Sequence, residues 1–222
     1  MNRFIVTIDG PTGTGKSTTA RLLAKKFGIK YIDSGAMYRT VTLEILRNDI
    51  KPNELKKIAE LAHSLEFEFS DENVFVNDKD VSNEIRSFEV TNKVSSVSKI
   101  KQLRDVLVSK QRKYSETGSI VMDGRDIGTV VFPNADYKFY LVCDSNARAA
   151  RRQQDFLDMG VKISVEKIIS EIKKRDELDM TRKVSPLVKA KDAVEVDTTN
   201  MIIEEQVDFL YKKITGSPKF GI

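Results

Sequence analysis

Apolar and polar positions follow two different periods along this chain. Between the apolar runs, apolar residues recur every three or four positions, as at Ala20, Leu23 and Phe27, which is the spacing of a helix. Five short runs lack polar alternation and predict buried strands: 4–9, 31–33, 119–123, 137–143 and 193–197. Buried strands that alternate with helices predict an α/β fold, with a parallel sheet covered by helices on both faces.

One segment departs from this pattern. Residues 65–69 and 73–77 alternate strictly between apolar and polar side chains, which predicts an antiparallel hairpin. Residues 79–87 follow it, and we expect them to turn helical. The whole segment, about 64–98, has few apolar residues for a core of its own. It is therefore predicted to be an insertion and not a separate domain.

Composition narrows the class of protein. The 222 residues suit one domain, and the net charge of +4 is unevenly placed. Between Arg148 and Lys191 there are twelve basic residues against seven acidic ones, so the rest is close to neutral. This excess is either a solvated face or a surface that closes over phosphates. One cysteine excludes an internal disulfide and favours a reducing compartment. No apolar segment has the length of a membrane span, so we expect a cytoplasmic protein.

The clearest chemical signal is Gly10-x-x-x-x-Gly15-Lys16-Ser17, which follows a predicted strand and opens a predicted helix. Glycines let backbone N–H groups turn toward phosphate oxygens, and the helix presents its positive end to the same anions. We expect Lys16 to reach the outer phosphates and the Ser17 hydroxyl to hold Mg²⁺. A guanine-nucleotide switch is weakly supported, because the nearest N-K-x-D sequence has Ser95 in place of Asp.

Three further polar clusters are expected near the ends of the predicted strands, where open α/β sheets bind ligands. Two follow strands directly, at 33–39 and 123–128. The third is a helical stripe that begins apolar and becomes charged: Ile168, Ile172, Arg175, Asp179 and Arg182.

Alone, an exposed Arg175–Asp179 pair contributes only about 0.3–0.5 kcal/mol. Beside a phosphate-binding loop, the arginine count favours a second anion site, formed by Arg39, Arg125, Arg175 and Arg182. A hydrolase needs a residue that orients water, whereas a kinase needs such a second site.

With these motifs in place, the chain resembles the bacterial cytidylate kinases, within the nucleoside-monophosphate kinase family. The resemblance runs nearly end to end and is carried by residues 7–18, 31–39, 80–87, 122–133, 171–182 and 185–199. It implies a P-loop NTPase fold with a five-stranded parallel sheet, as one kinase domain over 1–222. That domain divides into a core (about 1–63, 99–146 and 184–216), a monophosphate-binding insertion (about 64–98) and a helical lid (about 147–183).

The same resemblance implies ATP-dependent phosphorylation of CMP and dCMP with Mg²⁺. It assigns ATP to Gly10, Pro11, Thr12, Gly13, Thr14, Gly15, Lys16, Ser17, Thr18, Arg148 and Arg152. It assigns CMP to Ser34, Arg39, Ser95, Arg104, Arg125, Asp126, Arg175 and Asp179. The expected catalytic residues are Lys16, Arg125, Arg175 and Arg182, with Ser17 as the metal ligand. Either Asp33 or Asp123 is expected to support the ion from behind Ser17.

Base choice follows from hydrogen-bonding chemistry. A carboxylate accepts from the N4 amino group of cytosine, and Asp126 is the candidate, with Ser95 and Arg104 on the ring acceptors. The mismatch with uracil costs roughly 1–3 kcal/mol, so we expect a preference for CMP over UMP.

The main rival is a P-loop kinase for another small acceptor, such as UMP, AMP or shikimate. A nucleic-acid-binding module is disfavoured, because the chain has no Trp and no long basic stripe. We expect a monomer.

Overall fold

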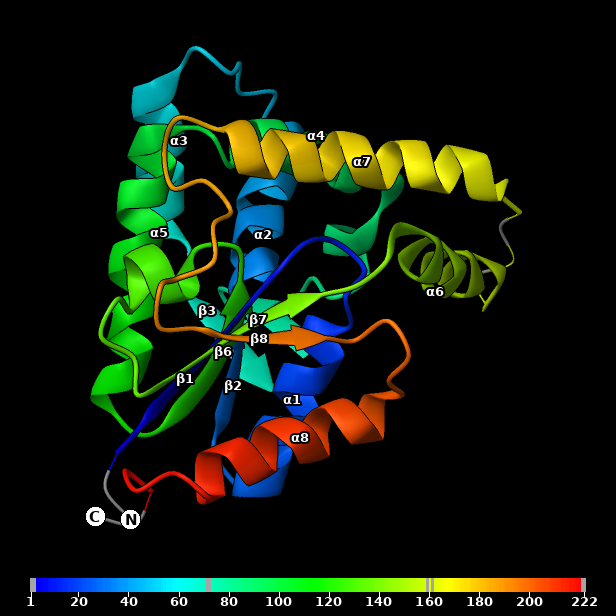
Figure 1. Ribbon diagram of the computed structural model, residues 1–222. Coiled ribbons are helices and arrows are strands. Elements are labelled where there is room, and N and C mark those ends of the chain that lie inside the picture. Colours follow the sequence, from blue (N-terminus) through cyan, green and yellow to red (C-terminus); the bar gives the residue numbers. More distant parts are fainter. Residues whose placement is uncertain (1–2, 71–72, 159, 161, 221–222) are drawn as a thin grey trace.

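The five predicted strands form one parallel sheet. The computed structural model describes residues 3–70, 73–158, 160 and 162–220. Its central sheet has the order β2-β6-β1-β7-β8 and consists of β1 (Ile5–Asp9), β2 (Lys30–Asp33), β6 (Ile120–Gly124), β7 (Tyr137–Val142) and β8 (Val194–Asp197) (Figure 1). Every adjacent pair is parallel. The predicted fold class is therefore confirmed.

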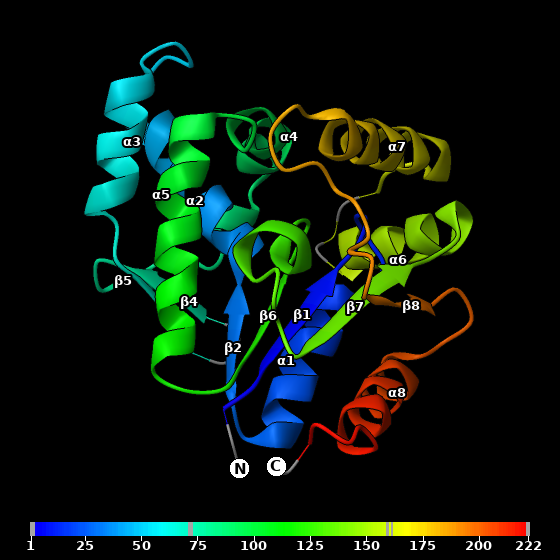
Figure 2. The same cartoon turned by 60° about the vertical axis from the view of Figure 1, so that its left-hand side comes forward.

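Helices cover both faces of this sheet (Figure 2). On one face, α1 (Lys16–Phe27) and α8 (Ile203–Thr215) pack together, with Leu23, Leu210 and Ile214 fully buried. Burial of each such side chain contributes about 1.5–3 kcal/mol. On the other face lie α5 (Lys101–Lys113), the short helix η2 (Tyr114–Glu116) and the π-helical turn η3 (Ile127–Val131), whereas α2 (Ser34–Arg47) begins at the carboxyl end of β2 and packs against α5 beyond the sheet.

The predicted hairpin is present, and the structure extends it. After α3 (Leu55–Ser64), β3 (Phe67–Ser70) pairs antiparallel with β4 (Asn73–Val76), while residues 71 and 72 lie outside the described part of the chain. A third strand, β5 (Lys79–Asp80), pairs with β4. The expectation of helix at 79–80 was therefore wrong. The reason is a tight turn at Asn77 and Asp78, whose φ angles of 47° and 64° are typical of two-residue hairpin turns.

The insertion shares its core with the neighbouring helices. The short helix η1 (Glu84–Arg86) and α4 (Phe88–Val97) follow β5. Val76 and Val94 of this segment are buried in the same cluster as Met37 of α2 and Leu103 of α5. The apolar side of the segment therefore completes a core that begins in α2, α3 and α5.

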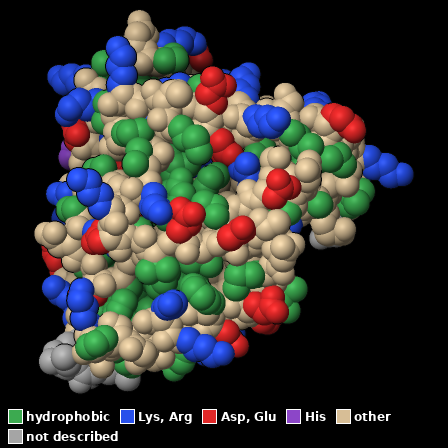
Figure 3. Space-filling model, viewed as in Figure 1, with side chains coloured by type: hydrophobic (Ala, Val, Ile, Leu, Met, Phe, Trp, Pro, Cys, Tyr) green, Lys and Arg blue, Asp and Glu red, His purple; other side chains and the backbone are tan. Residues whose placement is uncertain are grey.

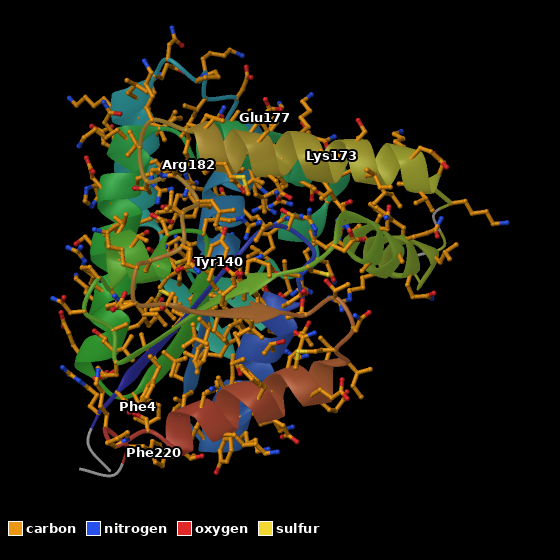
Figure 4. All side chains as sticks on the ribbon, viewed as in Figure 1. Phe4, Tyr140, Lys173, Glu177, Arg182 and Phe220 are labelled. Carbon is orange, nitrogen blue, oxygen red and sulfur yellow. The ribbon has the colours of Figure 1, made fainter. Side chains whose placement is uncertain are left out.

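Two helices lie beyond the carboxyl ends of the strands. These are α6 (Ser145–Asp158) and α7 (Val165–Thr181), which pack together through Ala149, Ile168 and Ile172 (Figure 1). The charged end of the predicted stripe is buried, with Asp179 5% and Arg182 7% exposed. In Figure 4, Arg182 lies on the side of α7 toward the sheet and Glu177 on the outer side. Among the described residues, no helix has the length and apolarity to cross a bilayer.

Candidate active site

The phosphate-binding loop turns sharply between β1 and α1. Gly10, Gly13 and Gly15 have φ angles of 155°, 79° and 87°, which side chains rarely adopt. A Cβ atom on Gly10 would lie 2.4 Å from the Leu141 carbonyl oxygen, so only glycine fits there. Inside the loop, Thr14 Oγ1 donates to the Pro11 carbonyl at 3.2 Å. The loop therefore aims the amino end of α1 into the space above the sheet.

Lys16, the first residue of α1, is buried at the base of this loop. Its Nζ donates to the Pro11 carbonyl at 3.0 Å. Burial lowers the pKa of Lys16 to about 7, and the positive charge of Arg125 adds to this effect. The ammonium group of Lys16 is poorly compensated by negative charge in the protein, and a bound polyphosphate would supply that charge.

Ser17 and Tyr31 hold the two oxygens of the Asp123 carboxylate. Ser17 Oγ donates to Oδ2 at 2.7 Å, and the Tyr31 hydroxyl donates to Oδ1 at 2.7 Å. Burial and, after it, the negative charge of Asp33 raise the pKa of Asp123 to about 6. Asp33 instead accepts from the Ala36 backbone at 2.9 Å, at the start of α2. Of the two carboxylates expected behind Ser17, Asp123 is thus the one that contacts it.

Most of the predicted site residues line one cavity of about 1040 Å³. The loop contributes Thr12, Gly13, Gly15, Lys16, Ser17 and Thr18. The rest of the lining includes Ser34, Arg39, Ser95, Arg125, Asp126, Arg152, Arg175 and Asp179. A phosphate-binding loop and a cluster of arginines therefore share one cavity, and Arg125 Nη2 donates to Thr12 Oγ1 of the loop at 2.9 Å.

The arginines that line the cavity repel one another. Burial lowers the pKa of Arg175 to about 9, with Arg39 and Arg125 as the next causes. Burial likewise lowers the pKa of Arg39 to about 10. These guanidinium groups stay charged near neutral pH. A bound anion would relieve the repulsion between them.

Asp126 anchors a buried charge cluster behind this wall. Its carboxylate accepts from Arg104 and lies 3.4 Å from Arg182 Nη2. Arg104 is only 2% exposed, and its second contact is the Ser98 carbonyl at 3.3 Å. Arg104 and Arg182 therefore support Asp126 from the interior, while Asp126 itself reaches the cavity.

Two predicted arginines of α6 differ in position. The Arg152 guanidinium lines the cavity and lies 4.7 Å from the centre of the Phe156 ring. Arg148 turns to the loop backbone, where it donates to the Thr12 carbonyl at 3.1 Å and pairs with Asp176. Sequence reasoning missed Asp176, because nothing in its spacing distinguishes it from a solvated carboxylate.

The sequence analysis also missed a stretch of the cavity wall. Residues 199–204 line the same cavity, and the Met201 carbonyl accepts from Arg151 Nη2 at 3.3 Å. They follow β8 directly, so the rule that placed the other clusters at strand ends applies to them as well. Tyr31 was missed for a different reason, since its position inside a strand suggested only packing.

Comparison with known proteins identifies the family to which this chain belongs. The family model described as cytidylate kinase matches residues 6–216. The chain belongs to the cytidylate kinase family. A cytidylate kinase of Fusobacterium nucleatum is 48% identical over 96% of this chain and 98% of its own length. That of Clostridioides difficile is 44% identical over 96% and 99%. The alternative that the chain is a P-loop kinase for another acceptor, such as UMP, AMP or shikimate, is therefore not favoured.

One solved structure resembles this chain in fold, but its sequence identity is too low to support a function. An uncharacterized protein from Eubacterium ventriosum has a TM-score of 0.54 at 13% sequence identity, over 97% of this chain and all of its own. Membership of the cytidylate kinase family therefore rests on sequence.

Proposed function

We propose that this protein transfers the γ-phosphoryl group of ATP to CMP and dCMP, giving ADP and CDP or dCDP. The observation that carries the proposal is the cavity that the phosphate-binding loop shares with Arg39, Arg125 and Arg175. Two anions held face to face satisfy the positional requirement of phosphoryl transfer. Membership of the cytidylate kinase family supports cytidine nucleotides as the acceptors.

Each side of the cavity has a separate task in this proposal. On the donor side, Gly10 to Thr18 cradle the ATP phosphates, Lys16 neutralises the outer ones, and Arg148 and Arg152 belong to the lid over them. On the acceptor side, Arg39 and Arg125 hold the CMP phosphate, while Arg175 stabilises the charge on the moving group. Arg182, which the sequence placed in this role, is buried against Asp126 and acts through that carboxylate. No general base is needed, because a phosphate-monoester oxygen is already anionic near neutral pH.

The residues around Ser17 fit a magnesium ion. Mg²⁺ prefers oxygen ligands, and Ser17 lines the cavity with Asp33 and Asp123. Ser17 donates its proton to Asp123 at 2.7 Å, so the lone pairs of its oxygen stay available to a metal. When bound with ATP, the ion would neutralise charge on the phosphates.

We assign base selection to Asp126, supported by Ser95 and Arg104. A cytosine amino group satisfies the carboxylate, whereas the uracil carbonyl oxygen opposes it. Asp179 and Arg175 would face the ribose, which makes dCMP a substrate as well. Asp126→Ala is expected to narrow the ratio of CMP to UMP turnover. An unchanged ratio would remove Asp126 from base selection.

The division of the chain into a core, an insertion and a lid belongs to the same proposal. We infer a core at about 1–63, 99–146 and 184–216, with 64–98 as the monophosphate-binding insertion and 147–183 as the lid. The phosphate-binding loop and the arginines belong to the same chain, so the proposed site needs no residue from a second copy, and we propose a monomer. The single cysteine supports a cytoplasmic location.

One assay tests the activity directly. ADP release should be measured with CMP, dCMP, UMP, AMP and no acceptor. We expect CMP and dCMP to stimulate release strongly, UMP weakly and AMP least. If saturating CMP does not accelerate ADP release, the proposal fails.

A nucleic-acid-binding role has little support from the surface. On the face drawn in Figure 3, Lys and Arg side chains are interspersed with Asp and Glu and form no continuous stripe. Filter binding with single-stranded RNA is expected to show no retention at physiological salt.

A further inference from the structure

Thr12 has an unusual position in the phosphate-binding loop, because each of its polar groups contacts a different distant element. Its N–H donates to Asp176 Oδ1 of α7 at 3.0 Å. Its carbonyl accepts from Arg148 Nη1 of α6 at 3.1 Å. Its hydroxyl accepts from Arg125 Nη2, directly after β6, at 2.9 Å. A single residue of the loop thus touches both lid helices and an arginine of the acceptor wall.

The hydroxyl contact helps to fix the direction of the Arg125 guanidinium. Arg125 Nε donates to Asp179 Oδ2 at 2.8 Å, and Nη2 donates to Thr12. Both donors belong to the Nε–Nη2 edge of the guanidinium, and two acceptors restrict the rotation of a planar fork more than one does. Removal of the Thr12 hydroxyl would leave Arg125 with the Asp179 carboxylate and the Gly124 carbonyl, which accepts from Nη1 at 3.3 Å.

The other two contacts bind the Thr12 peptide to the lid. Asp176 and Arg148 form an ion pair with each other, and their side chains are only 9% and 11% exposed. Asp176 also connects to Thr12 through an N–H, so one buried carboxylate contacts both α6 and the loop. At this exposure water competes little for these contacts, so they hold the Thr12 peptide rigidly against the two helices.

We propose that Thr12 is a positioning residue that links the lid to the acceptor site. When α6 and α7 dock on the Thr12 peptide, its hydroxyl sets the Arg125 guanidinium toward the phosphate of the acceptor. The inference rests on the proposed kinase function and adds to it. The loop at 10–18 then serves the acceptor as well as the donor, through one side chain.

Two substitutions isolate the hydroxyl. Thr12→Val keeps the size and β-branching but removes the acceptor, while Thr12→Ser keeps the acceptor. We expect Thr12→Val to raise the KM for CMP about tenfold, the scale of one hydrogen bond from a charged donor. The dissociation constant of a fluorescent ATP analogue should stay within about twofold, since the loop backbone is intact. Thr12→Ser should restore the KM for CMP.

A second pair of variants tests the lid side. Asp176→Ala removes the contacts to Thr12 and Arg148, whereas Glu177→Gln removes a neighbouring exposed charge on the same helix. We expect Asp176→Ala to raise the KM for CMP about tenfold in the natural chain. In a Thr12→Val background the same change should have an effect of about twofold or less, because the link to Arg125 is already broken. Glu177→Gln should leave the KM for CMP unchanged.

The outcomes separate this inference from the proposed function. If the natural chain shows no CMP-dependent ADP release, the kinase proposal itself is wrong. If it is active and Thr12→Val leaves the KM for CMP unchanged, or weakens ATP and CMP equally, Thr12 does not position Arg125. Additive effects of Thr12→Val and Asp176→Ala would overturn the link to the lid. Thermal unfolding of each variant checks that the fold is retained.

Discussion

The buried pairing of Asp126 with Arg104 makes a strong prediction about stability. Asp126 is 4% exposed and Arg104 is 2% exposed, so water screens neither charge. Arg104 Nε is buried without a hydrogen-bond partner among the described residues, and Nη1 contacts only the Ser98 carbonyl. The remaining support is the Tyr38 ring, 5.2 Å from the guanidinium carbon. Arg104 therefore depends on Asp126 for a counter-charge.

Asp126→Asn keeps the shape of this side chain and removes its charge. Loss of one partner from a buried ion pair costs about 3–5 kcal/mol, because the other charge is left uncompensated. That is a large part of the roughly 5–15 kcal/mol that stabilises a typical domain. For a chain of this size, each kcal/mol lowers the melting temperature by about 2–4 °C. The expected decrease is therefore about 6–20 °C.

Circular dichroism during heating measures this effect, with urea unfolding at 25 °C as a second readout. The matched control is Asp208→Asn, which breaks the Lys26–Asp208 pair on the surface, where the two side chains are 41% and 55% exposed. We expect no resolvable change in the control, because surface pairs are screened by water. If Asp126→Asn melts within about 2 °C of the control, the buried carboxylate does not compensate Arg104 as described.

Three further predictions follow from other parts of the site. Arg125→Ala should weaken CMP binding by about 10- to 100-fold and leave ATP binding nearly intact, as measured by calorimetry; equal losses would contradict its place on the acceptor wall. Burial raises the pKa of Asp9 from 3.8 to about 7, so the folded state holds this proton more tightly than the unfolded state. The contribution of Asp9 to the free energy of unfolding should then fall as pH rises from about 4 to about 7, by up to about 1.4 kcal/mol per pH unit. Urea unfolding at several pH values should show a weaker pH dependence of this free energy for Asp9→Asn than for the natural chain. Gly10→Ala should destabilise the fold by about 2–5 kcal/mol, because its Cβ would meet the Leu141 carbonyl oxygen at 2.4 Å. Gly118→Ala, where the added carbon meets nothing within 4 Å, serves as its control, and similar losses in both would refute the steric argument.

The sequence by itself determined the local structure. Strand and helix faces depend on spacings of two to four residues, so the sequence was sufficient to predict β1, β7 and α1. The loop at 10–18 was readable for the same reason, since its glycines, lysine and serine lie within eight positions. The tight turn at 77–78 overrode the helical reading of 79–80, because left-handed backbone at both positions returns the chain to β4.

Only the tertiary structure decided which distant side chains meet. Thr12 and Asp176 are 164 positions apart, and no spacing rule relates them. The strand order β2-β6-β1-β7-β8 places 123–128 beside the loop at 10–18. The packing of α6 on α7 turns Arg148 to the loop backbone and leaves Arg152 on the cavity wall. Residue types and periods set what each segment can form, whereas the direction of a long charged side chain depends on burial and on partners that folding brings together.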